Sequence, residues 1–142
     1  QEPDYLIKAT KLIKLISKSA IENPFGFGQL LSALYLKVKS PVEICIVRRA
    51  NATNQLVKSS MALWLNRQFI PNSISAVIEE GLELERLQKY SYFKGKVGEQ
   101  DTEKVSEYSF VCQNFTCSVP IYSVENLEGH VKNIETKRLN QN

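Results

Sequence analysis

The sequence predicts an α/β protein: an N-terminal helical hairpin, residues 1–40, followed by a small three-layer α/β unit, residues 41–142, with about three strands. Three observations carry this prediction. Apolar residues recur every three or four positions through residues 5–38, which is the period of an amphipathic helix. Two short runs rich in β-branched residues, 42–47 and 73–78, flank a further helical pattern. Strand, helix, strand with short connections predicts a parallel βαβ unit with a right-handed crossover, and we expect the whole chain to fold as one piece.

Composition limits the classes of function. The chain has 142 residues with 43% hydrophobic and 23% charged side chains, close to the average of a globular domain. A net charge of +3 without a concentrated basic stretch argues against nucleic acid as a partner. No apolar run approaches the roughly 20 residues that span a bilayer, so we expect no membrane partner. Cys45 lies in an apolar strand, and a buried free thiol there fits a reducing compartment, so we expect a cytoplasmic protein.

The hairpin is expected to consist of two helices. Asp4 is the predicted N-cap of the first helix. We interpret the lysine stripe of this helix as a solvated face rather than a membrane-binding surface. The apolar stripe is then expected to face a core. Pro24 interrupts the pattern, because the residue before a proline is pushed out of helical space. The second helix, Gln29–Lys37, is apolar around most of its circumference and is expected to need cover on more than one side.

The α/β unit begins with a strand at Val42–Val47, predicted to be buried on both faces. Asn51 or Thr53 is expected to cap a long helix that runs from Leu56 to Phe69. Pro71 and Asn72 stop this helix, and a second strand follows at Ser73–Ile78.

The remaining elements are a short helix, a loop, a strand and a final helix. Gly81 opens a short helix over Leu82–Gln88, and the charged, nearly apolar-free stretch 94–106 predicts an exposed, mobile loop. Tyr108 to Pro120 is expected to form the third strand, closed by the proline. A final helix is predicted from the apolar positions Val124, Leu127, Val131 and Ile134.

Cys112 and Cys117 are candidate redox residues. In a continuous strand, residues five apart point to opposite faces, so the two thiols can meet only if residues 113–116 turn back. The spacing matches neither a standard zinc site nor a thioredoxin motif, and a second Cys/His pair that could complete a metal site is missing. We therefore predict no metal site and interpret the pair first as buried structural thiols, with redox use as the alternative.

Arg48 and Arg49 are candidate anion ligands. They follow the first strand just before an expected helix N-terminus, the place where open α/β sheets bind anions, and Thr53 lies in the same loop. The loop has no glycine, and the chain carries neither a dinucleotide fingerprint nor a P-loop, so no cofactor is predicted. We therefore interpret the stretch first as a solvated loop, with anion binding as the alternative.

No catalytic residue is assigned. Glu79, Glu80, Glu83 and Glu85 cluster after the second strand, but acidic residues also suit a solvated helix start, where they complement the helix dipole. A nucleophilic triad finds little support, because His130 is the only histidine of the chain.

The segment Phe110-Val-Cys112-Gln-Asn-Phe-Thr-Cys117-Ser-Val-Pro120 resembles the C-terminal signature of the thioredoxin-domain-containing family that includes spermatogenesis-associated protein 20 and its bacterial and archaeal relatives. Members carry an aromatic residue, Val-Cys, Asn-(Phe/Tyr)-Thr-Cys and a nearby proline at this place. The upstream order of helical hairpin, strand, helix and strand is also similar. Relatives tend to place glycine after the first strand, where this chain has Arg48 and Arg49.

This resemblance implies a larger parent protein with an N-terminal thioredoxin-like domain and a six-hairpin α/α barrel similar to sugar epimerases and glycosidases. Residues 1–40 would complete that barrel, and both the CxxC motif and the barrel's carboxylates would lie upstream. The implied function is a non-catalytic C-terminal portion of a protein with sugar- or redox-related activity. Its partner would be the rest of that polypeptide, or a second copy through the N-terminal helices, and we expect an exposed apolar face between Tyr5 and Val38. The alternatives are a thiol redox accessory at Cys112 and Cys117 and an anion- or nucleotide-binding module at Arg48 and Arg49.

Overall fold

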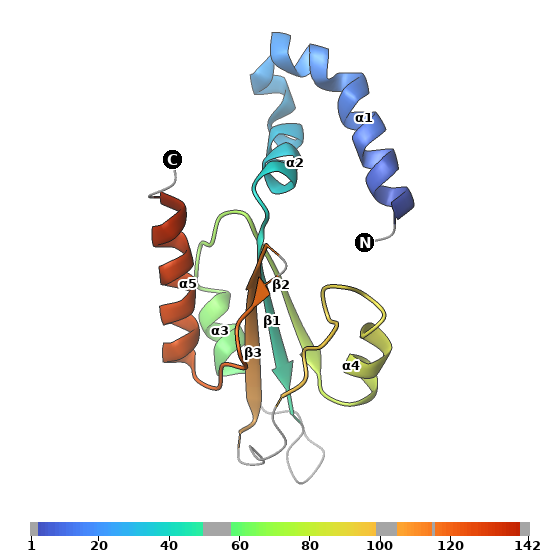
Figure 1. The fold of residues 1–142 in the computed structure, drawn as a ribbon. Helices are drawn as coiled ribbons and strands as arrows, with labels where there is room; N and C mark the ends of the chain where they lie inside the picture. The colour runs from blue at the N-terminus through green and yellow to red at the C-terminus, as the bar shows by residue number, and fades with distance from the viewer. Residues whose placement is uncertain (1–2, 50–57, 99–104, 115, 140–142) are drawn as a thin grey trace. The chain divides into compact units, whose positions relative to one another are not determined.

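The computed structural model describes residues 3–49, 58–98, 105–114 and 116–139 (Figure 1). The chain divides into two compact units, Gln1–Ser40 and Pro41–Asn142, and each is described by itself. Its fold is mixed α/β, with helices first and a sheet after them, as the sequence predicts. Within the described ranges, no helix is both long enough and apolar enough to cross a membrane.

The first unit consists of two α-helices joined by a short 3-10 helix. Their bounds are α1 Pro3–Glu22, η1 Pro24–Phe27 and α2 Gly28–Val38. Asn23 leaves the helical region, with a φ of −139°, because the following proline disfavours it. α2 turns back toward the N-terminal end of α1 (Figure 1), and the Lys37 Nζ donates a hydrogen bond of 2.7 Å to the Thr10 hydroxyl. The predicted pair of N-terminal helices is confirmed.

The apolar side chains of this first unit are mostly exposed. Among its described residues, Ala20 is the only buried one. The exposed large apolar side chains are Tyr5, Leu6, Ile7, Leu12, Leu15, Ile21, Phe25, Leu31, Tyr35, Leu36 and Val38. Two helices that meet mainly at their joined ends cannot cover each other's apolar stripes. The prediction that the first helix faces a core is therefore wrong for the described structure, whereas the exposed apolar face expected between Tyr5 and Val38 is present.

The second unit is built on a four-stranded sheet of order β2-β1-β3-β4. The strands are β1 Val42–Arg48, β2 Ser73–Glu79, β3 Glu107–Gln113 and β4 Thr116–Cys117. β1 is parallel to β2 and antiparallel to β3. The parallel βαβ arrangement predicted for the first two strands is confirmed, and β1 is buried on both faces as expected.

The predicted third strand is a hairpin rather than one continuous strand. β3 and β4 are antiparallel neighbours, and Asn114 at the turn between them has a φ of 50°. Asparagine tolerates this left-handed conformation better than most residues, so the chain can reverse within a few positions. After β4, the Ser118 amide still bonds to the Val111 carbonyl, and Ile121 pairs with Ser109 on β3. The segment to Pro120 therefore contributes two antiparallel stretches to the sheet.

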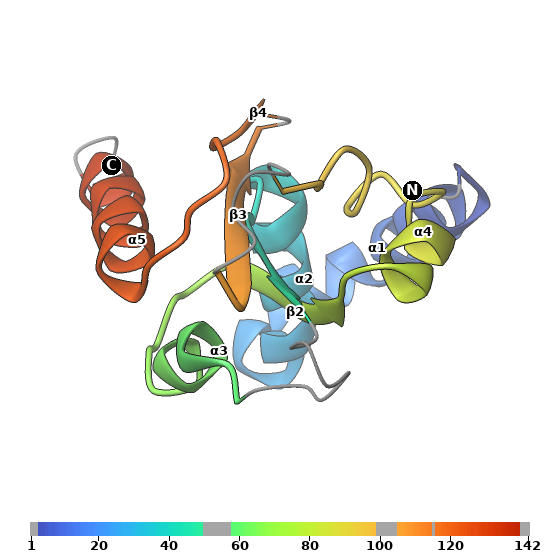
Figure 2. The same cartoon turned by 90° about the horizontal axis from the view of Figure 1, so that it is seen from below.

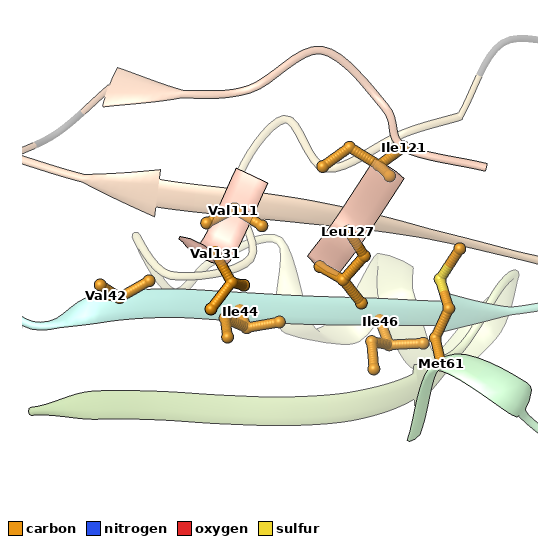
Figure 3. Close-up of a cluster of buried hydrophobic side chains, with 8 residues drawn as sticks. All are labelled: Val42, Ile44, Ile46, Met61, Val111, Ile121, Leu127 and Val131. Atoms are coloured by element: carbon orange, nitrogen blue, oxygen red, sulfur yellow. The ribbon is translucent and has the colours of Figure 1, made fainter. Parts of the chain in front are cut away.

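Helices cover both faces of the sheet, which gives the predicted three layers. α3, Ser60–Leu65, and α5, Val124–Leu139, lie on one side, and α4, Leu82–Leu87, lies on the other (Figure 2). The core on the α3/α5 side is formed by Val42, Ile44, Ile46, Met61, Val111, Ile121, Leu127 and Val131 (Figure 3). The core on the α4 side is formed by Cys45, Val47, Ile78, Leu84, Tyr108, Phe110 and Cys112. Alternate residues of β1 and β3 enter opposite cores, as strand geometry requires.

α3 is shorter than the sequence predicts. The expected caps Asn51 and Thr53 and the expected start at Leu56 lie outside the described residues. Within them, Lys58 and Ser59 precede the helix, and residues 66–69 follow it. Ser59 is the N-cap, and its hydroxyl accepts a hydrogen bond of 2.9 Å from the Ala62 amide. The predicted helix is therefore confirmed over Ser60–Leu65, and its expected extension to Phe69 is wrong.

The start of α3 is held by the buried carboxylate of Glu107 on β3. Glu107 accepts hydrogen bonds from the amides of Ser60, at 2.9 Å, and Met61, at 3.1 Å. It also accepts from the hydroxyls of Ser60, at 2.6 Å, and Ser59. An acid at this place satisfies amides that have no partner within the helix and complements the positive end of the helix dipole. Ser59 is a local cap of the kind that sequence rules recognise, whereas the acceptor Glu107 is far from α3 in the sequence and no local pattern reports it.

The loop after α4 is less exposed than predicted. Lys96 is 2% exposed, and Gly98 is also buried. A Cβ on Gly98 would come within 2.8 Å of the Arg49 guanidinium and of the Tyr108 ring, so only glycine fits where this loop crosses those side chains. The prediction of an exposed loop over 94–106 is therefore wrong at these two residues, while residues 99–104 lie outside the described ranges.

Replacing Glu107 by glutamine should lower the free energy of unfolding by about 1–3 kcal/mol, because hydrogen bonds to a buried carboxylate are lost or weakened. Urea denaturation measures the change. Glu125→Gln, at an exposed acid in the first turn of α5, is the matched control and should change stability by less than about 0.5 kcal/mol. Equal midpoints for Glu107→Gln and the unmodified protein would contradict the assigned capping role.

Candidate functional site

The candidate site is the disulfide between Cys112 on β3 and Cys117 on β4. The two residues are directly paired across the hairpin, and their Cα atoms are 4.0 Å apart. The chain turns back between them at Asn114, which meets the condition under which the sequence allowed the thiols to meet. The interpretation as two separate buried thiols is wrong, because the two sulfur atoms are bonded to each other and Cys117 is exposed.

The two halves of this disulfide have different surroundings. Cys112 is 2% exposed and belongs to the α4-side core, whereas Cys117 is exposed on a strand at the edge of the sheet. Of the two residues, Cys117 is therefore the one that a reagent from solvent can approach. Attack there would displace the buried sulfur of Cys112.

A buried lysine lies beside the exposed half of the disulfide. The Lys96 Nζ is 3.9 Å from the Cys117 Sγ. It also donates a hydrogen bond to the Tyr92 carbonyl oxygen and lies 4.9 Å from the centre of the Tyr92 ring. The disulfide sulfur, the carbonyl and the ring face are all weak partners for a positive charge.

Burial lowers the pKa of Lys96, because the charged ammonium is poorly solvated, while the neighbouring Cys45 and Glu43 act in the opposite direction. The ion pairs between described side chains are Arg49–Glu80 and Lys132–Glu128, so Lys96 pairs with no described carboxylate. Among the described residues, the site thus contains a buried amine without a directly bound counter-ion.

Glu43 lies in the same row of the sheet as the disulfide. It is the direct partner of Cys112 across the β1–β3 pair, and Cys112 is in turn the partner of Cys117. Directly opposed residues on neighbouring strands point to the same face. Glu43, Cys112 and Cys117 therefore follow one another on the α4 side, and Glu43 acts electrostatically on Lys96.

Cys45 is the third sulfur on this face, and it is a free thiol. It is 0% exposed, and burial raises its pKa to about 11, against a smaller opposing effect of Lys96. A rise from 9.0 to about 11 reduces the thiolate fraction at neutral pH roughly a hundredfold. Cys45 should therefore be unreactive in the folded protein.

Tyr92 fixes the position of the segment that carries Lys96. Its hydroxyl donates a hydrogen bond of 2.6 Å to the Ile44 carbonyl, and its ring packs against Phe93 and the α4-side core. Burial raises the pKa of Tyr92, and the nearby Cys45 and Glu43 raise it further. The phenol therefore stays protonated and remains a hydrogen-bond donor near neutral pH.

The predicted anion-binding residues are placed at the other end of the sheet's strands. Arg49 Nε donates a hydrogen bond of 2.8 Å to Glu80, and its guanidinium lies 4.9 Å from the centre of the Tyr108 ring. The Tyr108 hydroxyl also donates a hydrogen bond of 2.9 Å to Glu80. Burial, and to a smaller extent this hydrogen bond, raises the pKa of Tyr108. Arg48 has a buried Nε without a hydrogen-bond partner, and Thr53 lies outside the described residues. Anion binding at Arg48 and Arg49 stays a prediction, and a ligand there would compete with Glu80.

The other candidate groups are not brought together at one place. Glu83 accepts a hydrogen bond of 2.5 Å from the Glu79 amide, while Glu80 accepts hydrogen bonds from Arg49 and Tyr108. His130 lines a separate hollow of about 450 Å³ between α5 and residues 119–123. Across the ranges described, no three His, Cys, Asp or Glu side chains are close enough to hold a metal ion.

Sequence reasoning missed Lys96 as a functional residue. It lies in a charged stretch next to other lysines, and a lysine is usually solvated. The two glycines at positions 95 and 98 are the only local signal, since they allow a close passage of the chain. That signal indicates a turn but does not show which side chain is buried by it.

Comparison of the chain with protein-family models, with curated proteins and with solved structures gave no match.

Stability should decrease as the pH rises from about 9 to 11, because the folded protein holds the Cys45 proton more tightly than the unfolded chain does. The contribution of Cys45 should reach about 2–3 kcal/mol, since a tenfold change in proton affinity corresponds to about 1.4 kcal/mol. Tyr92 and Tyr108 act in the same direction, and Lys96, whose pKa is lowered, acts in the opposite one.

The Cys45 contribution is isolated by comparing the pH dependence of urea denaturation in Cys45→Ala and in the unmodified protein. The variant should be less sensitive to pH above 9, whatever its absolute stability. Identical slopes in the two proteins would mean that the thiol ionises equally well in the folded and unfolded states.

Proposed function

We propose that the Cys112–Cys117 pair is a site of thiol–disulfide exchange, and that the chain acts as a thiol redox accessory rather than as an enzyme on its own. The observation that carries this proposal is the asymmetry of the disulfide. Cys117 is exposed at the sheet edge, whereas Cys112 is 2% exposed. In this proposal an external reagent reaches the pair at Cys117, the residue outside the core, and Cys112 reacts from within the core.

The exchange needs only an external thiol or disulfide. In the oxidising direction, the Cys117 thiolate attacks a sulfur of an external disulfide, forms a mixed disulfide and releases one external thiolate. Cys112 then loses its proton and attacks the Cys117 sulfur, which releases the second external thiolate and closes the Cys112–Cys117 bond. Two electrons pass from the protein dithiol to the external disulfide, and the reverse sequence reduces the protein.

A cytoplasmic location, proposed from the free thiol of Cys45, fits this function. Disulfides in a reducing compartment are usually transient and take part in catalysis or redox sensing. A pair that is directly opposed in a hairpin can open and close with little displacement of the chain, because hydrogen bonds of the neighbouring Val111–Ser118 and Ser109–Ile121 pairs hold the two stretches together. The rest of the fold then persists in both redox states.

The folded, reduced protein should form the Cys112–Cys117 disulfide when it is treated with oxidised glutathione at neutral pH, and mass spectrometry should detect a mixed disulfide on Cys117 before it closes. Cys112→Ser should trap that adduct, because the attacking thiol is missing. Cys45 should remain unmodified in the same sample, since its thiol is buried and protonated.

The Cys112→Ser/Cys117→Ser variant, with Cys45 unchanged, is the matched control and should take up no glutathione while it is folded. A disulfide that neither forms nor opens in a glutathione buffer until the protein is unfolded would show that the bond is purely structural.

A second candidate function is favoured by the exposed apolar side chains of α1 and α2. Eleven large apolar residues of this unit are exposed, from Tyr5 to Val38, and apolar patches on this scale usually mark a protein interface. The resemblance to the thioredoxin-domain-containing family suggests the occupant, namely the helices of an α/α barrel in the same parent polypeptide. In this proposal the chain is a non-catalytic C-terminal portion that packs on the barrel, and self-association covers the same face when the barrel is missing.

The chain on its own should therefore self-associate or bind an apolar dye through its first unit. Leu12→Lys/Leu15→Lys should reduce both effects, because these side chains are 58% and 78% exposed on α1. Sedimentation and dye fluorescence measure the change. Val119→Lys places the same charge at an exposed valine of the second unit and should have no effect. A monodisperse monomer that binds no dye would contradict this second proposal.

A further inference from the structure

We propose that Lys96 determines which sulfur of the pair exchanges: its buried ammonium stabilises the thiolate of Cys117, so that Cys117 is the nucleophile toward external disulfides and Cys112 is the resolving cysteine. This inference rests on the proposed thiol–disulfide exchange. It adds the order in which the two cysteines react and the side chain that controls it.

The first argument is the position of the ammonium. The Lys96 Nζ lies 3.9 Å from the Cys117 Sγ. A cation at this separation favours the thiolate over the thiol, which is how cysteine pKa values are lowered in proteins. The effect should be larger than at an exposed lysine, because Lys96 is 2% exposed and is screened little by solvent.

The second argument is that Lys96 itself gains a counter-ion when the disulfide opens. In the oxidised protein its ammonium contacts a carbonyl oxygen, a ring face and an uncharged sulfur among the described residues. A buried charge without an opposite charge is costly, and burial accordingly lowers the pKa of Lys96. Reduction converts the neighbouring sulfur into a group that can carry a negative charge. The ammonium and the thiolate would then stabilise each other.

The third argument concerns the competing groups that face Lys96. Cys45 and Glu43 approach it from β1, and Tyr92 approaches it from the segment after α4. The thiol of Cys45 and the phenol of Tyr92 stay protonated near neutral pH, because burial raises both pKa values. Glu43 is therefore the one anion of this set in the oxidised protein. Its charge should oppose formation of the Cys117 thiolate, in the opposite sense to Lys96.

The fourth argument is the position of Cys112. Its sulfur is in the α4-side core, so external disulfides reach it poorly, and its direct neighbour on β1 is the carboxylate of Glu43. Both features disfavour a Cys112 thiolate in the free dithiol. Cys112 is thus suited to react second, after a mixed disulfide has formed at Cys117. The substrate class is a disulfide whose sulfur is accessible to solvent, and oxidised glutathione is a suitable probe.

The test measures the pKa of the Cys117 thiol in the full chain carrying Cys45→Ala and Cys112→Ser, where Cys117 is the only thiol. The rate of iodoacetamide alkylation as a function of pH gives this pKa. We expect a midpoint at least about one pH unit below the ordinary value of roughly 8.5. Lys96→Met in the same background should return the midpoint to the ordinary value or above it.

Two further variants separate the electrostatic role from a structural one. Lys94→Met removes the same charge from an exposed lysine two positions away and should leave the midpoint unchanged. Glu43→Gln removes the opposing charge and should lower the midpoint further. Damage to the fold would not shift the midpoint in opposite directions for Lys96→Met and Glu43→Gln.

The outcomes distinguish this inference from the function on which it rests. A Cys117 pKa at or above the ordinary value, or a Lys96→Met variant with an unchanged midpoint, overturns the role of Lys96 even when glutathione exchange proceeds. Absence of exchange in the unmodified protein overturns the proposed function instead. If Lys96→Met does not fold, two other measurements decide the question: the Cys117 alkylation midpoint in the starting background and its shift in Glu43→Gln. A midpoint that is not lowered contradicts the inference. An upward shift in Glu43→Gln contradicts it as well.

Discussion

The second unit depends on β1, whose two faces must both be covered. β1 is hydrogen-bonded to a parallel strand on one side and an antiparallel strand on the other, and four of its seven residues have no exposed surface. Burial of β-branched side chains on both faces is the largest favourable term available to such a strand. It requires one layer from α3 and α5 and a second layer from α4 and the segment that follows it.

The second of these layers creates the candidate site. α4 is only six residues long and contributes Leu84 to the α4-side core, and Tyr92 and Phe93 of the following segment pack against the same core. The Tyr92 hydroxyl ties this segment to the Ile44 carbonyl of β1, and the chain then passes over the β3–β4 hairpin. Lys96 is buried as a consequence of that path, beside Cys117 rather than in solvent. A requirement of packing thus places a cation next to a sulfur.

Several elements could be predicted because their signals are local. The β-branched runs at β1 and β2, the glycine before α4 and the apolar repeat of α5 each determine their own backbone conformation. Other features were missed, either because the partner is distant in the sequence or because a local signal was not recognised. The N-cap Ser59 is a local signal for the start of α3, but the second acceptor of its first amides, Glu107 on β3, is not reported by any pattern between residues 58 and 69. The prediction of one strand from Tyr108 to Pro120 failed, because the left-handed conformation of Asn114 reverses the chain.

The sequence by itself determined the α/β class, the parallel βαβ unit, the two N-terminal helices and the cysteines as candidate site residues. These follow from the period of apolar residues and from residue types at turns, which act over a few positions. Only the tertiary structure decided that Cys112 and Cys117 are bonded, that their exposures differ and that Lys96 and Glu43 face them. Charge and burial at a site depend on which strands and loops meet there. That meeting is set by the packing of the whole unit, which no short segment of the chain encodes.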